Sequence, residues 1–157
     1  MNFVSRILQN YKKAILSKIL ELVKYSKENS EEYREINFGT ISNFKAQDIN
    51  MKTGVPVLQC TKVLSSDGIS HAFESHGDDV KQKLRGQIGI QDSDFELIPS
   101  ILNDYDSVEK GLNNRQKFSA VLFKKKINKR IYHVVMIVLG NKDNRHLKFK
   151  TMYIKPE

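Results

Sequence analysis

The sequence predicts an α+β fold, in which a long N-terminal helix and several short helices pack on an antiparallel sheet of four or more strands. Three observations support this fold class. Apolar residues recur every three or four positions near the N-terminus, as they do on one face of a helix. Short helix-like segments follow between turn residues. From residue 107 onward, short apolar or alternating runs are joined by turn sequences, which is typical of an antiparallel meander.

The first expected element is a helix over residues 2–30. Lys18 stands where a strict coiled-coil heptad would continue, which argues against a long coiled coil. Polar residues 27–35 follow, and we place a boundary there between an N-terminal helical extension (1–35) and the main domain (36–157). We expect the apolar stripe of the helix to be buried against the domain, a second copy or another protein. The stripe consists of Val4, Leu8, Tyr11, Ile15, Ile19 and Leu22.

The central elements are short. Residues 36–66 look extended between turn signals. The run "SSDGISHAFESHGDD" predicts a short helix that Gly77 ends. The run "QDSDFELIPSILNDYD" has helical spacing, with Pro99 as its weak point. Four strands are then expected in "SVEKGL", "KFSAVLFKKKI", "RIYHVVMIVLG" and "LKFKTMYIKP".

The net charge of +8 is concentrated near the C-terminus, where residues 112–157 hold twelve basic and two acidic residues. Such a surface attracts nucleic-acid phosphates, anionic lipid or an acidic protein, although it could also be only a solvated sheet face. The longest apolar run, "VVMIVL", is too short to span a membrane, and we see no signal-peptide pattern. The single cysteine, Cys60, excludes an internal disulfide. The candidate residues for binding RNA or a partner are Lys124, Lys125, Lys126, Lys129, Arg130, Lys148 and Lys150.

Two histidines of the short helix are candidates for chemistry. His71 and His76 are five residues apart, so they lie about 140° apart around a helix and cannot form a zinc pair of the i, i+4 kind. We therefore expect neither a metal nor a cofactor. His76 continues the stripe that contains Phe73 and lies at the helix end, a position that suits acid–base chemistry. The alternative is that His76 only caps the helix or packs in the core, and we expect His71 to face solvent.

Further candidates accompany His76. Thr151 and Tyr153 alternate along the last strand and share a face, and Lys117 and Ser119 do the same on an earlier strand. Together with Arg85, these residues provide what metal-free RNA cleavage needs, which is a base for the 2′-OH and groups that stabilise the charged phosphorane. The alternatives are ordinary strand residues and, for Arg85, a surface charge.

The ordered set "ISHAFESHG", "LRGQIGIQDSDFELIPSIL", "YDSVEKG" and "LKFKTMYIKP" resembles the barnase/EndoU/colicin/RelE-like nuclease superfamily over residues 60–157. It is most similar to the phage-associated branch found in MuF-type minor capsid proteins and polymorphic toxins. The resemblance implies a metal-independent nuclease with an RNA substrate. It assigns His76 as the acid–base and Arg85 as a phosphate binder, and it places Thr151 and Tyr153 in the site.

The resemblance also implies a cognate immunity protein, which we expect to be acidic. The predicted function is an endoribonuclease toxin, delivered into the cytoplasm of a target bacterial cell. The alternative is a non-catalytic nucleic-acid-binding or capsid-associated module that uses the basic sheet. A DNase is a third possibility, but no carboxylate cluster for Mg²⁺ is visible in the sequence outside the acidic helices.

Overall fold

The structure is a computed structural model that describes residues 2–28, 31–112 and 118–157. The helices are α1 (Phe3–Glu28), α2 (Asn43–Thr53), α3 (Ser66–His76), α4 (Asp79–Leu84), the 3-10 helix η1 (Asp92–Leu97) and α5 (Ile98–Asn103). The strands are β1 (Glu35–Thr40), β2 (Thr61–Ser65), β3 (Ser107–Lys110), β4 (Ala120–Ile127), β5 (Arg130–Leu139) and β6 (His146–Pro156).

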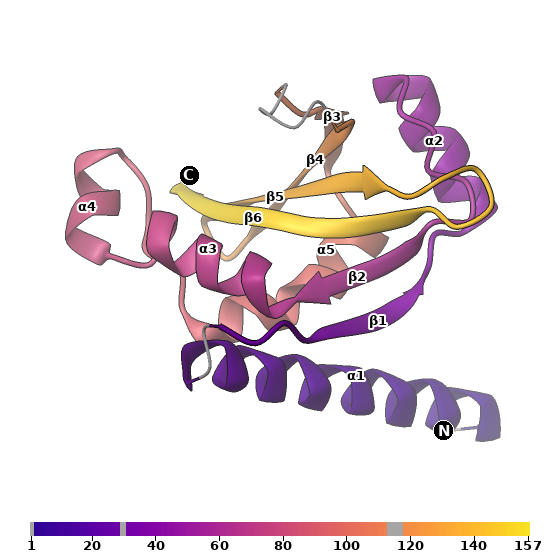
Figure 1. Cartoon of the computed structure of the whole chain (residues 1–157), viewed down its shortest axis with the longest axis horizontal. Helices are drawn as coiled ribbons and strands as arrows, with labels where there is room; N and C mark the ends of the chain where they lie inside the picture. Colours follow the sequence, from indigo (N-terminus) through magenta and orange to yellow (C-terminus); the bar gives the residue numbers. More distant parts are fainter. Residues whose placement is uncertain (1, 29–30, 113–117) are drawn as a thin grey trace.

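Six strands of the described chain form one open sheet in the order β1-β2-β6-β5-β4-β3 (Figure 1). The meander predicted from the last strands is confirmed as β3-β4-β5-β6, and β1 and β2 extend it. Every neighbouring pair is antiparallel except β2 and β6, which are parallel. The long connection between β2 and β6, with its helices and strands, lets the chain return in the same direction. The α+β fold class is therefore confirmed, with a larger and mostly antiparallel sheet.

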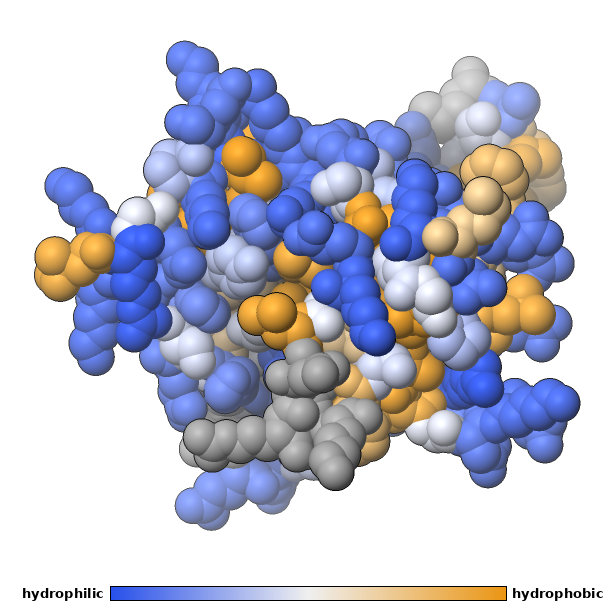
Figure 2. Space-filling model, turned by 90° about the horizontal axis from the view of Figure 1, so that it is seen from above, coloured by the Kyte–Doolittle hydropathy of each residue, from blue (hydrophilic) through white to orange (hydrophobic). Residues whose placement is uncertain are grey.

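One face of the sheet packs against helices and forms the core. On β6, this face presents Leu147, Phe149, Met152 and Ile154, all buried. The pairing of β5 with β6 is irregular between Thr151 and Phe149, where β6 has one extra residue. The buried face of β6 therefore carries odd-numbered residues before this point and even-numbered residues after it. Figure 2, which looks from the side remote from α1, shows hydrophilic residues over much of the visible surface, with separate hydrophobic groups between them. The opposite face, called here the second sheet face, carries Lys124, His133, Lys148, Thr151, Tyr153 and Lys155.

The N-terminal helix is confirmed, but only its C-terminal half is buried. Val4 is 63% exposed, and Leu8 and Tyr11 are each 55% exposed. The body of this chain does not bury these three residues, and Leu8 and Tyr11 line a groove instead of filling it. Burial of this part of the stripe against a second copy or another protein stays a prediction. None of the helices in the described ranges combines the length and apolar character that crossing a bilayer requires. The buried residues of the stripe are Ile15, Ile19 and Leu22, which join the core together with Val23.

Helix α2 was not predicted, because it buries only Ala46 and Ile49 and so has little apolar periodicity. Its ends carry the signal instead. The Ser42 side chain accepts from the backbone of the first turn, and Gly54 ends the helix with a left-handed φ of 74°.

The helical segment around Pro99 is divided in the structure. Residues before it form η1, and α5 begins at Ile98 with Pro99 in its first turn, where a missing N–H is tolerated. The predicted weak point is therefore a helix boundary.

Candidate functional site

His76 is the last residue of α3, as the sequence predicted. The Ser65 side chain caps the start of the helix by accepting from the backbone of Gly68 at 3.4 Å. At the other end, a Cβ on residue 77 would lie 2.6 Å from the Phe73 carbonyl oxygen, so Gly77 is required by close approach. The chain can therefore turn immediately after His76, which leaves its imidazole half-buried at the helix end. His71 is exposed, which confirms the expectation that it faces away.

Gln82 of α4 determines which nitrogen of His76 carries the proton. Its side chain is buried, and its Nε2 donates to the Ser75 carbonyl at 2.9 Å, which leaves Oε1 free to accept. His76 Nδ1 lies 3.1 Å from that Oε1. Because an amide oxygen can only accept, Nδ1 carries the hydrogen and Nε2 of the neutral ring presents a lone pair. His76 is thus oriented to take a proton through Nε2.

Arg85 reaches the same carbonyl. Its Nη1 donates to the Ser75 oxygen at 3.4 Å, and the side chain is otherwise exposed. Arg85 therefore reaches the end of α3, where His76 lies, and the sequence analysis placed both residues in one site. An exposed guanidinium held at the end of α3 can bind a phosphate oxygen.

Tyr153 connects His76 to the second sheet face. Its ring centroid lies 5.6 Å from that of His76 and 4.4 Å from that of His133, on which it stacks at an interplanar angle of 13°. The β5–β6 register pairs His133 directly with Tyr153. We call His76, His133 and Tyr153 the histidine cluster. One ring thus touches two imidazoles that come from different parts of the fold.

His133 was not predicted as a site residue. It is 5% exposed, and its Nδ1 donates to the Ile131 carbonyl at 3.1 Å, which leaves Nε2 as the acceptor of the neutral ring. Burial lowers the pKa of His133, and the nearby ammonium groups of Lys124 and Lys155 add to this effect, although the bond to Ile131 opposes it. The ring is therefore held as neutral imidazole.

Two lysines flank the histidine cluster on the second sheet face. Lys124 is paired with His133 in the β4–β5 register and forms an ion pair with Glu109 at 2.8 Å. Lys155, which the sequence did not single out, lies with its Nζ 5.8 Å from the centre of the Tyr153 ring. Burial raises the pKa of the Tyr153 phenol, so this hydroxyl stays protonated at neutral pH and can act as a donor.

Thr151 shares the face of Tyr153, as the alternation in the sequence predicted. Its register partner Val135 lies two residues from His133, the partner of Tyr153. The Thr151 Oγ1 is buried and has no hydrogen-bond partner among the described residues. A buried hydroxyl without a partner is uncommon, so this oxygen is a candidate contact for a ligand.

Ser119, a further catalytic candidate, is not brought to the cluster. Ser119 directly precedes β4, five residues from Lys124, which corresponds to about 16 Å along an extended chain. Its carbonyl accepts from Val138 near the far end of β5. Lys117 lies outside the described residues.

Most of the predicted binding lysines have acidic partners. Lys125 contacts Asp104 at 3.2 Å and Asp106 at 3.4 Å, on the core side of β4, and Lys126 pairs with Glu157. These pairs reduce the positive potential that a charge count from the sequence suggests. Lys129 is exposed in the β4–β5 turn, and Arg130 and Lys150 are half-buried.

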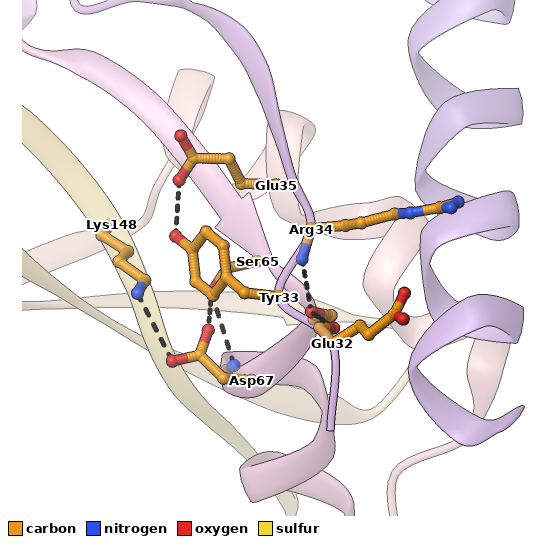
Figure 3. Close-up of polar contacts among 9 residues, drawn as sticks. Glu32, Tyr33, Arg34, Glu35, Ser65, Asp67 and Lys148 are labelled. Atoms are coloured by element: carbon orange, nitrogen blue, oxygen red, sulfur yellow. Dashed lines mark hydrogen bonds and ion pairs between the residues drawn. The ribbon is translucent and has the colours of Figure 1, made fainter. Parts of the chain in front are cut away.

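A second polar cluster lies where β1, β2 and β6 meet the start of α3 (Figure 3). The Tyr33 hydroxyl donates to Glu35, and the Lys148 Nζ lies 3.5 Å from Asp67 and 4.9 Å from the centre of the Tyr33 ring. Ser65 bonds to the same Asp67 carboxylate. The charge of Lys148, a predicted RNA contact, is therefore largely compensated at this end of the sheet.

The histidine cluster has the groups that acid–base chemistry needs, next to positively charged groups that can bind an anion. His76 presents a nitrogen with a lone pair, and Tyr153 presents a protonated hydroxyl. Arg85, Lys124 and Lys155 supply positive charge nearby. Within residues 2–28, 31–112 and 118–157, no group of three His, Cys, Asp or Glu side chains is arranged to hold a metal ion.

A family model described as phage-Barnase-EndoU-ColicinE5/D-RelE like nuclease matches residues 39–157. The match begins near the end of β1 and includes every residue of the histidine cluster. No curated protein and no solved structure gives a match to the chain.

Proposed function

Since the chain belongs to the phage-Barnase-EndoU-ColicinE5/D-RelE like nuclease family, we propose that this nuclease cleaves RNA at the histidine cluster by metal-independent acid–base catalysis. The observation that carries the proposal is the orientation of His76. His76 Nδ1 donates to Gln82 Oε1 at 3.1 Å, so the lone pair of the neutral ring is on Nε2. The imidazole lies next to the Tyr153 ring.

In the proposed reaction, His76 Nε2 takes the proton of the ribose 2′-OH, and the 2′-oxygen attacks the adjacent phosphorus. The bond from phosphorus to the 5′-oxygen breaks, and Tyr153 gives its proton to that leaving oxygen. The products are a 2′,3′-cyclic phosphate and a free 5′-hydroxyl. Proton transfers of this kind contribute about 10²–10⁴-fold each to a rate.

The charged groups around the cluster suit the phosphate. Arg85 bonds to the carbonyl of Ser75, the residue before His76, and Lys124 and Lys155 lie on the sheet face that also carries Tyr153. They would stabilise the negative charge that grows on the non-bridging oxygens, and the unpartnered Thr151 hydroxyl would donate to one of them. His133 stacks on Tyr153 and acts as a positioning residue for it.

We further propose that the protein is a toxin that acts on RNA in the cytoplasm of a target bacterial cell. The net charge of +8 supports recognition of RNA and also of an acidic cognate immunity protein. Expression of the chain in bacteria should stop growth, and His76→Ala should restore it. Normal growth with active, folded protein inside the cell would contradict the toxin proposal while leaving nuclease activity intact.

The test of catalysis is cleavage of total RNA, and of a DNA of matched sequence, in the presence of EDTA. His76→Ala should lower the RNA cleavage rate by about 10²–10⁴-fold. His71→Ala is the matched control, because it removes an exposed imidazole from the same helix and should leave the rate unchanged.

Three outcomes would contradict the proposal. Full activity of folded His76→Ala would exclude this residue as the base. Activity that EDTA abolishes and one metal restores would exclude the metal-independent mechanism. RNA that stays intact but shifts on a gel would favour the non-catalytic binding module.

A further inference from the structure

A groove lies on the opposite side of the sheet from the histidine cluster, between the N-terminal half of α1 and the body. Leu8, Tyr11 and Ile15 of α1 form one wall, and Phe38 and Pro99 face them. Its volume is about 570 Å³. This hollow is large enough to receive side chains from another molecule.

Lys62 lies at the base of the groove and is only 6% exposed. Its Nζ contacts Asn103 Oδ1 at 3.4 Å and lies 5.4 Å from the centre of the Phe38 ring. Within the described ranges, Lys62 forms no ion pair, and the nearby Asp104 pairs with Lys125 instead. Burial lowers the pKa of the Lys62 amine. A buried ammonium with one long hydrogen bond is incompletely satisfied, and a carboxylate entering the groove would complete it.

The apolar stripe of α1 continues this groove toward the N-terminus. Val4, Leu8 and Tyr11 follow at helical spacing and are each more than half exposed, and Phe3 and Ile7 beside them are 76% and 51% exposed. Figure 1 shows α1 along the side of the molecule remote from β6. Side chains at such spacing pack against the apolar face of another helix.

The charge of this half of α1 specifies the partner. From Phe3 to Leu20 the helix carries no acidic residue, and its basic residues are Arg6, Lys12, Lys13 and Lys18. A second copy of α1 would bring the same positive charges together, which disfavours pairing between copies. An anionic lipid surface would meet the exposed stripe but would not reach an ammonium at the base of the groove.

We propose that the groove binds an acidic amphipathic helix of another protein, with its apolar face on Leu8 and Tyr11 and one carboxylate on Lys62. This site lies apart from the histidine cluster, so the proposal does not rest on the proposed function. Helix-in-groove binding of this kind depends on a few apolar anchors and on complementary charge at the edges.

The experiment is titration of the full chain with a labelled synthetic helix of leucine, alanine and glutamate, about five turns long. A scrambled peptide of the same composition, and a version with glutamine in place of glutamate, are the peptide controls. Lys62→Met should weaken binding by about tenfold or more, because it removes the buried cation and keeps a chain of similar shape. Lys18→Met is the matched control, since it removes one charge from the exposed side of α1, and its binding should stay within about twofold of the parent protein.

Binding that follows this pattern, and that Leu8→Ser also weakens, would support the groove. Equal binding of the acidic and scrambled peptides, or no effect of Lys62→Met in a folded variant, would overturn it. Two further results would also overturn it: a dimer that Leu8→Ser dissociates, or flotation with phosphatidylserine vesicles that Lys62→Met leaves unchanged.

Discussion

Replacement of Gln82 by leucine removes the group that orients His76 while keeping a buried side chain of similar size. Two hydrogen bonds are lost, one to the Ser75 carbonyl at 2.9 Å and one to His76 Nδ1 at 3.1 Å. The carbonyl keeps only the longer contact with Arg85. We therefore expect a loss of about 1–3 kcal/mol in the free energy of unfolding, the cost of a buried acceptor without its donor. For a chain of this size, that loss lowers Tm by roughly 2–4 °C per kcal/mol.

The effect on catalysis can be estimated from the lost bond to His76. A hydrogen bond contributes about 0.5–1.5 kcal/mol to the preferred tautomer, and 1.4 kcal/mol corresponds to about tenfold in rate. Loss of ring orientation adds to this, so kcat should fall by about 10–100-fold in Gln82→Leu. The assay is the initial rate of cleavage of an RNA oligonucleotide at saturating substrate, at a temperature where the variant is fully folded.

Gln82→Glu separates orientation from general structural damage. The carboxylate still accepts from His76 Nδ1, but its negative charge stabilises the imidazolium, so the acid limb of the pH–rate profile should move to higher pH. Gln82→Leu should not produce that movement. Unchanged kcat in folded Gln82→Leu, or equal losses in both variants with the pH profile unmoved, would refute the role assigned to Gln82.

Three other predictions concern stability, RNA binding and pH. Ile19→Ala should lower the free energy of unfolding by about 2–5 kcal/mol, measured by thermal unfolding, whereas Leu8→Ala, at a position 55% exposed, should lower it by less than about 1 kcal/mol. Equal losses of stability would contradict a helix that is buried only in its C-terminal half. Lys155→Ala should weaken RNA binding and reduce the slope of log K against log salt by about 1. Lys125→Ala should change neither the affinity nor the slope, because the Lys125 ammonium is paired with Asp104 and Asp106 on the core side of the sheet. Equal effects of the two substitutions would show that both lysines contact phosphate. Folding lowers the pKa of His133, so as the pH falls the imidazole is protonated in the unfolded chain before it is protonated in the folded chain. The contribution of His133 to stability is therefore fully present above about pH 6.5 and is lost as the pH falls below that value. His133→Phe should therefore show a smaller fall in Tm between neutral and acidic pH than the parent protein, and an identical fall would exclude this histidine as the cause.

The fold class could be predicted because it depends on periodicity. The helical stripe around Ile15 and the alternation around Tyr153 are local patterns, and each directly reports one side of an element. The β2–β6 pairing could not be predicted, because two short strands far apart in the sequence carry no signal of their contact. The exposure of Leu8 was missed for a similar reason, since a stripe shows which face is apolar but not how far the partner extends.

Part of the candidate site could be predicted from local patterns of the same kind. His76 was proposed from its place on the short helix, and Thr151 and Tyr153 from their alternation. His133 was missed because it lies within the apolar run "RIYHVVMIVLG", where it looks like a strand residue. Its alternation with Tyr132 and Val134 places it on the other face, but only the β5–β6 register brings it to Tyr153.

The roles of some residues depend on contacts that no local pattern shows. Gln82 was missed because its importance depends on its bond to His76. Lys125 and Lys148 were counted as free charges because their acidic partners come from other elements of the fold.

The most direct test of catalysis by His76 is the chemical identity of the cleaved ends. A short RNA is cut by the full chain in EDTA, and the fragments are weighed by mass spectrometry. We expect a 2′,3′-cyclic phosphate on one fragment and a 5′-hydroxyl on the other. Neither end forms when the nucleotide before the cut is 2′-deoxy, and both form about 10²–10⁴-fold more slowly when the enzyme is His76→Ala. Fragments with 5′-phosphate ends that form from the 2′-deoxy substrate would contradict attack by the 2′-oxygen, and with it the assignment of His76 as the base.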